Sequence, residues 1–155
     1  MFPQKERLKN LNEAKRFLSG LFRTQHLAVL ATQHRGAPYV SLVAFAHMDD
    51  LRHLLFATTR ATRKYSYLSE DSRIALLIDN RLNADSDFHN ASAVTVIGSA
   101  AEGEKEPLLL KVYLDKVPYL RDFVQAPTCA LIRVTVQKYL IVQRFQNVTE
   151  VQVDW

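Results

Sequence analysis

The sequence predicts one mainly β domain, in which six or seven antiparallel strands form a closed or partly open barrel with flanking helices. Short apolar segments of strand length follow one another between tight turns. Helical periodicity is confined to the N-terminus, the segment after the third strand and the segment before the last strands. Strands and helices do not alternate as in βαβ units, which argues against a doubly wound sheet. Barrel closure would remove exposed strand edges.

The 155 residues suffice for a single domain with its own core. We expect an N-terminal helix in 1–25, a barrel core in 26–103, a helical insert in 104–126 and closing strands in 127–155. No segment reaches the ~18 consecutive apolar residues of a membrane span, and the charged N-terminus does not resemble a secretory signal. We therefore expect a cytoplasmic protein without a membrane partner.

Charge and glycine content exclude several function classes. The net charge of +4 comes from residues 1–25, which hold six basic and two acidic residues. A solvated helix face explains this charge, whereas a nucleic-acid-binding barrel would also need a basic stripe with interleaved aromatic residues. Nucleic-acid binding thus stays a weaker hypothesis, and no nucleic-acid partner is expected. With only four glycines, the chain has neither G-x-G-x-x-G nor a P-loop.

The first half of the chain predicts a helix and then a meander. Residues 4–24 have an amphipathic pattern, and Ser19-Gly20 favours a break near its end. Strands are expected at 26–32, 39–48 and 53–58, with turns at 33–38 and Asp49-Asp50.

The second half of the chain predicts the remaining barrel strands and three short helices. Thr62 is a plausible N-cap for a short helix through Leu68. The apolar run 73–80 predicts a strand buried on both faces, and a polar loop at 81–91 follows it. A long strand at 92–103 has a bend or bulge at Gly98. Helices at 104–116 and 118–124 are separated at Pro118. Closing strands fill 128–145, and 148–155 alternates.

The segment Thr58-Thr59-Arg60-Ala61-Thr62-Arg63-Lys64 is the strongest candidate for a phosphate site. It places three hydroxyls and three cations where a strand ends and a helix begins. Arginine offers a planar fork, lysine a point charge and the helix N-terminus free N–H groups, which together suit a phosphate. The alternative is a solvated helix start whose cations pair with Glu70 and Asp71. The residues alone favour neither.

A family resemblance favours the phosphate. The ordered segments LAVLAT, GAP, YVSLVAFAHMDD, HLLFATTRATRKYSYLSEDSRIALLIDN and AVTVIGSAAE, from about His26 to Glu102, resemble the pyridoxamine 5′-phosphate oxidase-like FMN-binding split-barrel family. The resemblance implies a split barrel in which Thr62, Arg63 and Lys64 hold the phosphate of flavin mononucleotide (FMN). Thr58, with Thr59 beside it, matches a threonine at the end of strand three.

The same resemblance implies a homodimer with the flavin at the subunit interface. Its ring would rest against Tyr39, Val40, Ser41 and Leu42. The loop that starts at Asn80 would approach from the partner chain. Trp155 would stack on or near the flavin, or else anchor a surface or interface.

The sequence departs from pyridoxamine phosphate oxidases themselves in two places. Leu42 and His47 stand where those enzymes carry an arginine and a lysine on strand two, and no segment rich in arginine and histidine follows Gln143. We therefore expect a relative with a different reaction. His47 would either face the flavin phosphate or be an edge residue.

The resulting hypothesis is an FMN-dependent oxidoreductase that acts on a small-molecule substrate or a redox partner. No side chain stands out as an acid or base catalyst, as expected if hydride passes directly to the flavin. The alternative is a carrier or electron-transfer protein for FMN, the deazaflavin F420 or heme. The histidine spacing predicts no protein-built metal site, although heme held by one histidine stays open. Cys129, the only cysteine, excludes an intrachain disulfide and is expected to be a buried, unreactive thiol.

Overall fold

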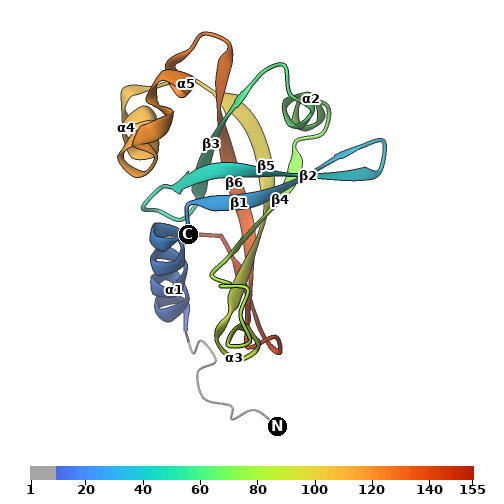
Figure 1. Ribbon diagram of the computed structural model, residues 1–155, viewed down its shortest axis with the longest axis vertical. Coiled ribbons are helices and arrows are strands. Elements are labelled where there is room, and N and C mark those ends of the chain that lie inside the picture. Colours follow the sequence, from blue (N-terminus) through green and yellow to red (C-terminus); the bar gives the residue numbers. More distant parts are fainter. Residues whose placement is uncertain (1–9) are drawn as a thin grey trace.

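The computed structural model describes residues 10–155, which form a six-stranded antiparallel barrel with a seventh strand and flanking helices (Figure 1). The sheet order is β3-β2-β1-β4-β5-β6-β7, and an additional β3–β6 pairing closes the barrel. The predicted fold class is therefore confirmed. The strands are β1 Leu27–His34, β2 Ala37–His47, β3 His53–Thr59, β4 Arg73–Asp79, β5 Ser92–Gly103, β6 Cys129–Gln143 and β7 Asn147–Gln152.

Helix α1 (Leu11–Thr24) covers one end of the barrel, which we call the α1 end. Asn10 caps the helix by accepting a hydrogen bond from the Glu13 amide. The ring of Phe22 is fully buried and packs against Phe45 and Tyr139. The break expected at Ser19-Gly20 is wrong, because Leu18 and Leu21 are buried on both sides of it and hold the helix together. The part of the predicted helix at 4–9 lies outside the described residues.

Helix α2 (Arg63–Glu70) lies at the opposite end, which we call the α2 end. Its Leu68 is buried in the same barrel core as Phe22. Strands β1 and β2 are paired along their length, and the turn between them places Arg35 and Gly36 at positive φ, +50° and +81°. Glycine reaches this left-handed region without a steric penalty, as the predicted turn requires.

The barrel is split between β2 and β3. These strands pair only over Phe45–His47 of β2. Within the described chain, residues 37–44 therefore have a strand partner on the β1 side alone. The hydroxyl of Tyr113 donates to the carbonyl oxygen of Ala44 at 3.1 Å from the open side. In a β-strand alternate residues point their backbone groups the same way, so those of Val40 and Leu42 also face the split.

Strand β4 differs from the prediction of burial on both faces. Ile74, Leu76 and Ile78 are buried, but Arg73 and Leu77 are exposed in the single chain. The strand is part of a barrel wall, so one face points into the core and the other points outward. The sequence did not show which face is exposed, because the outward residues Ala75 and Leu77 are apolar too.

The bulge predicted at Gly98 is confirmed by a shift in the β5–β6 register between Ile97 and Gly98. A Cβ atom at this position would lie 2.2 Å from the carbonyl oxygen of Thr135. The strand backbones therefore approach each other too closely for any other residue type without local rearrangement.

The remaining helices are α3 (Asp87–Asn90), α4 (Pro107–Lys116) and α5 (Arg121–Gln125), with a 3₁₀ turn at Pro118–Leu120. The predicted separation at Pro118 is confirmed. Helices α4 and α5 form a second apolar cluster against the outer side of β2, β3 and β6, made of Ala46, Leu55, Leu109, Tyr113, Leu114, Val124 and Leu131. No helix within residues 10–155 is long and apolar enough to cross a membrane.

Candidate functional site

The connection from β3 to α2 is organised by two threonine hydroxyls. Thr62 caps α2, as predicted, because its Oγ1 accepts a hydrogen bond from the amide of Tyr65 at 3.3 Å. The same oxygen lies 2.8 Å from the Oγ1 of Thr58 and donates to the carbonyl of Thr59. These contacts fix the direction in which the first turn of α2 presents its side chains.

Arg63 and Lys64 begin that first turn without partners. Arg63 is exposed and Lys64 half-buried, and neither forms a hydrogen bond or ion pair with any residue in 10–155. Their expected alternative partners are otherwise engaged, because Glu70 binds His34 and Asp71 binds Arg73. The predicted pairing with Glu70 and Asp71 is therefore absent. Two uncompensated cations lie beside the free amides of a helix N-terminus, an arrangement that attracts anions.

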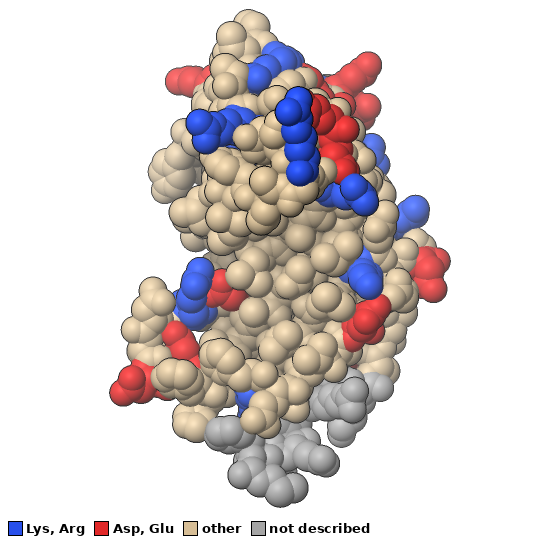
Figure 2. Space-filling view, turned by 90° about the vertical axis from the view of Figure 1, so that its right-hand side faces the viewer, with Lys and Arg blue, Asp and Glu red and all other residues tan. Residues whose placement is uncertain are grey.

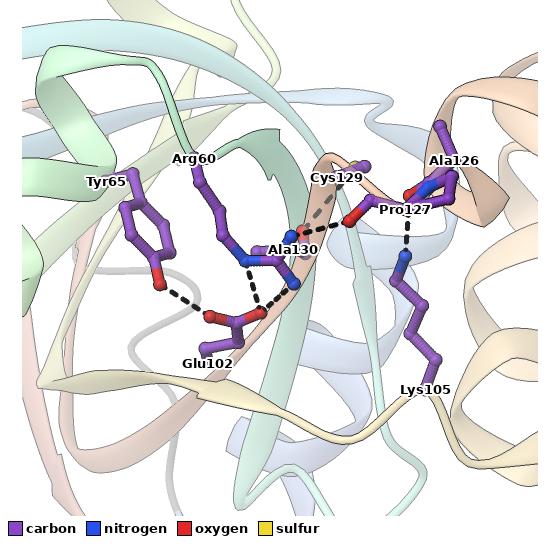
Figure 3. A network of polar contacts seen from close by, with 8 residues as sticks. All are labelled: Arg60, Tyr65, Glu102, Lys105, Ala126, Pro127, Cys129 and Ala130. Atoms are coloured by element: carbon purple, nitrogen blue, oxygen red, sulfur yellow. Dashed lines mark hydrogen bonds and ion pairs between the residues drawn. The ribbon is translucent and has the colours of Figure 1, made fainter.

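Arg60, the third cation of the segment, has a different environment (Figure 3). Its guanidinium forms an ion pair with Glu102 of β5 and donates to the carbonyl of Pro127 at 2.7 Å. The hydroxyl of Tyr65 donates to the other oxygen of Glu102 at 2.5 Å. Hydrogen bonds from Arg60 and Tyr65 hold the pKa of Glu102 below its usual value. Arg60 thus connects the β3–α2 segment to β5 and to the segment before β6.

Tyr39 of β2 comes close to α2. Its ring meets that of Tyr67 edge-on at 5.6 Å, and His34 stacks on the same Tyr67 ring at 4.9 Å. Tyr67 follows Arg63 by four residues, so the two share a helix face. The structure therefore brings the predicted strand-two segment and the predicted phosphate segment to one end of the barrel. Sequence reasoning missed Tyr67, although its spacing from Arg63 was visible.

The rest of the strand-two segment borders the split. Val40 and Leu42 are 62% and 66% exposed. The Oγ of Ser41 is buried without a hydrogen-bond partner, as is the Oγ1 of Thr32 on β1. An open strand edge, apolar side chains and unsatisfied hydroxyls thus lie next to a helix that carries unpaired cations.

Comparison with known proteins assigns the chain to a family. The profile of the pyridoxamine 5′-phosphate oxidase family matches residues 12–143, most of the chain. The chain belongs to this family. A search of curated proteins gave no match.

Solved structures agree with this family at the level of the fold. A heme binding protein from Mycobacterium smegmatis is 17% identical, with a TM-score of 0.77 over 90% of this chain and 57% of that one. General Stress Protein 26 from Bacillus anthracis is 19% identical, with a TM-score of 0.70 over 90% and 98%. A FAD-binding protein from Mesorhizobium loti is 17% identical, with a TM-score of 0.67 over 81% and 90%.

Two residues that the family resemblance implicated lie away from α2 in the single chain. Asn80 follows β4 at its far end, where its Oδ1 accepts a hydrogen bond from the amide of Ser92 at 2.7 Å. The indole of Trp155 donates to the carbonyl of Asp50 at 2.8 Å, and Lys15 lies over its ring. Trp155 therefore anchors the segment after β7 to α1 and to the β2–β3 turn. Flavin contacts by Asn80 and Trp155 stay predictions.

The ring nitrogens of His47 and the thiol of Cys129 are both buried. His47 lies at the α1 end, where its ring packs against Phe22 at 5.7 Å, on the opposite side of the barrel from α2. Cys129 is buried, as expected, and burial raises the pKa of its thiol. No group of three or more potential metal ligands occurs among residues 10–155.

Proposed function

We propose that this protein binds FMN at the α2 end and works as a flavin-dependent oxidoreductase. The observation that carries the proposal is the pair Arg63 and Lys64, which lack partners in the described chain and flank the N-terminus of α2. Charge-assisted hydrogen bonds from such groups favour a phosphate dianion. Thr62, whose hydroxyl lies beside that of Thr58, would complete the proposed phosphate site by turning its proton from the carbonyl of Thr59 to the phosphate.

The split between β2 and β3 supports a position for the flavin ring. Backbone groups of Val40 and Leu42 would hydrogen-bond its polar edge, and Tyr39 and Ser41 would border it. The buried hydroxyl of Ser41 would gain a partner there, which it lacks in the protein alone. The bound flavin would supply the two-electron redox chemistry, while these residues orient it and limit access of water.

We further propose a homodimer with the flavin between subunits. The outward face of β2, β1 and β4 is apolar, and the strand register places Leu42, Val29 and Leu77 side by side. Leu27 is 54% exposed. Figure 2 shows that the face bearing the β1–β2 hairpin has few charged side chains across its middle. Exposed apolar side chains that gather on one face are typical of an interface. The Asn80 loop would then reach the partner's flavin.

The first experiment is an absorbance spectrum of freshly purified protein, followed by mass analysis of the released ligand. We expect flavin bands and FMN. In the Arg63→Ala/Lys64→Ala double variant the protein should purify without cofactor. Lys111→Ala, at an exposed lysine on α4, is the matched control and should retain it. Stoichiometric FMN in the double variant would refute the phosphate assignment, and a monomer by light scattering would refute the proposed dimer.

The second candidate is a carrier without turnover, for flavin, F420 or heme. It is favoured by the heme binding protein among the structural neighbours. Steady-state turnover with NAD(P)H and small-molecule or protein acceptors would select the oxidoreductase. A heme Soret band in the purified protein would select the carrier. We place either activity in the cytoplasm, in keeping with the single reduced Cys129.

A further inference from the structure

A cavity of about 340 Å³ lies at the α1 end, away from the proposed flavin site. It opens between the end of α1, the end of β2 and the last turn of α4. Its lining contains a cluster of ionisable groups. The lining residues are Arg23, Ala46, His47, Asp49, Val112, Asp115 and Lys116.

Lys116 is the most unusual member of this cluster. Its Nζ is shielded from solvent and has no hydrogen-bond partner. It lies 3.5 Å from the centroid of the Phe45 ring, and this cation–π contact is what stabilises its charge among residues 10–155. Burial lowers the pKa of this amine to about 8. A buried ammonium group without an acceptor is costly unless a ligand supplies one.

His47 is also buried without hydrogen-bond partners. Both of its ring nitrogens are buried without a partner. Burial lowers its pKa, and the positive charges of Lys116 and Arg23 lower it further, against an opposing effect of Asp49. A neutral imidazole has one N–H to donate. The wall of the cavity therefore carries two unsatisfied donors, from β2 and from α4.

The remaining charges leave the cavity positive near these donors. Arg23 lies at the exposed rim, and Asp115 is bound by Lys111 on the outer side of α4. Asp49 is the one other carboxylate in the lining. The lining thus contains two cations, Arg23 and Lys116, but only one carboxylate without a lysine partner, that of Asp49.

We propose that this cavity binds the carboxylate or phosphate group of a small molecule, held by Lys116 and His47 with Arg23 at the entrance. The four-carbon stem of Lys116 would carry its ammonium from the face of Phe45 toward the anion. This site is distinct from the proposed flavin phosphate site, because the cavity lies at the α1 end and that phosphate site lies at the α2 end.

The test uses the full-length protein as purified and two probes, inorganic phosphate and succinate. NMR signals of the His47 ring and the Lys116 ε-methylene are followed during each titration. We expect saturable shifts with at least one probe, and affinity at least tenfold weaker in Lys116→Met. Lys138→Met, at a lysine of β6 that pairs with Glu150 and does not line the cavity, is the control and should bind as the wild type does. The probe that binds more tightly identifies the anionic group.

Two outcomes would overturn the proposal. The first is the absence of saturable shifts with both probes, and the second is equal binding by wild type and Lys116→Met. Thermal unfolding gives an independent measurement. In buffer free of both probes Lys116→Met should unfold at a higher temperature than wild type, because it removes an unpaired buried charge. Phosphate or succinate should then stabilise wild type and leave Lys116→Met unchanged. A lower unfolding temperature for Lys116→Met would mean that the amine is already satisfied, and would also overturn the proposal.

Discussion

The two ends of the barrel satisfy their polar groups in different ways. At the α2 end, Arg60, Tyr65 and Glu102 form a closed network, and the exposed Arg63 and half-buried Lys64 are the cations beside it that lack partners within residues 10–155. At the α1 end, the buried Lys116 and His47 have no hydrogen-bond partners at all. A cation that is paired within the chain stabilises the fold, whereas one that is left unpaired is available to a ligand. Arginines and lysines with partners in the chain are therefore expected to be structural, and those without partners are expected to bind ligands.

The largest effects should come from core residues beneath each end. Phe22→Ala removes a fully buried ring at the α1 end and should lower the free energy of unfolding by about 3–5 kcal/mol. Leu68→Ala, which removes the buried side chain of α2 itself, should cost about 2–5 kcal/mol. Denaturant titration measures both costs. In the folded fraction only Leu68→Ala should weaken FMN binding, because it loosens the helix that carries Arg63. Equal loss of FMN in both variants would contradict the separation of the two ends.

The next effect distinguishes two arginines of one segment. Arg63→Met should weaken FMN binding roughly 10- to 100-fold, the value of a charge-assisted hydrogen bond, without changing the unfolding temperature. Arg60→Met should do the reverse, because Arg60 binds Glu102 and the carbonyl of Pro127. Fluorescence titration with FMN and thermal unfolding measure the two properties. If Arg60→Met loses FMN as severely as Arg63→Met at a temperature where both are folded, the division of roles is wrong.

A smaller effect concerns acid stability at the α2 end. The pKa of Glu102 is lowered from 4.5 by Arg60 and Tyr65. The paired carboxylate therefore adds stability above pH 4.5, and this contribution is lost as the pH falls through the lowered pKa. Thermal unfolding from pH 7 to pH 3 should show wild type more stable than Glu102→Gln at neutral pH. The difference should shrink in acid, and a constant difference would show that ionisation of Glu102 contributes nothing.

The last effect, at the α1 end, appears only in alkali. The pKa of Lys116 falls from 10.5 in the unfolded chain to about 8 in the folded protein. Between these values the unfolded chain binds more protons, so stability rises with pH. Wild type should therefore gain stability relative to Lys116→Met between pH 8 and pH 10, measured by denaturant titration. No relative gain would mean that the amine is solvated in the folded protein.

Much of the fold could be predicted because local patterns and global structure agree. The Thr62 cap, the bulge at Gly98 and the helix break at Pro118 each depend on a residue type with a specific backbone preference. The order of short apolar segments then indicated a barrel. The errors have local causes too: Gly20 is tolerated because its neighbours are buried, and β4 is apolar on a face that points outward.

The candidate site was predictable only in part. Arg60 and Arg63 have the same chemistry and lie three residues apart, so the sequence does not say which one is paired. The answer depends on Glu102, which barrel closure brings beside the β3–α2 connection. Lys116 gave no signal in the sequence, because a lysine in the last turn of a helix is usually a solvated partner of the helix dipole. Its burial over Phe45 follows from tertiary packing alone.

Strand β6 has a consequence for how the chain folds. It pairs with β5, β7 and β3, and it joins residues far apart in the chain, such as His53 with Thr135 and Thr59 with Cys129. The entropy lost in closing such long loops makes these pairings slow to form. On the ribosome β1 to β5 would emerge first, with the edges of β3 and β5 open until β6 inserts between them. A chain that ends before Cys129 would keep both edges exposed and would be prone to aggregate through them.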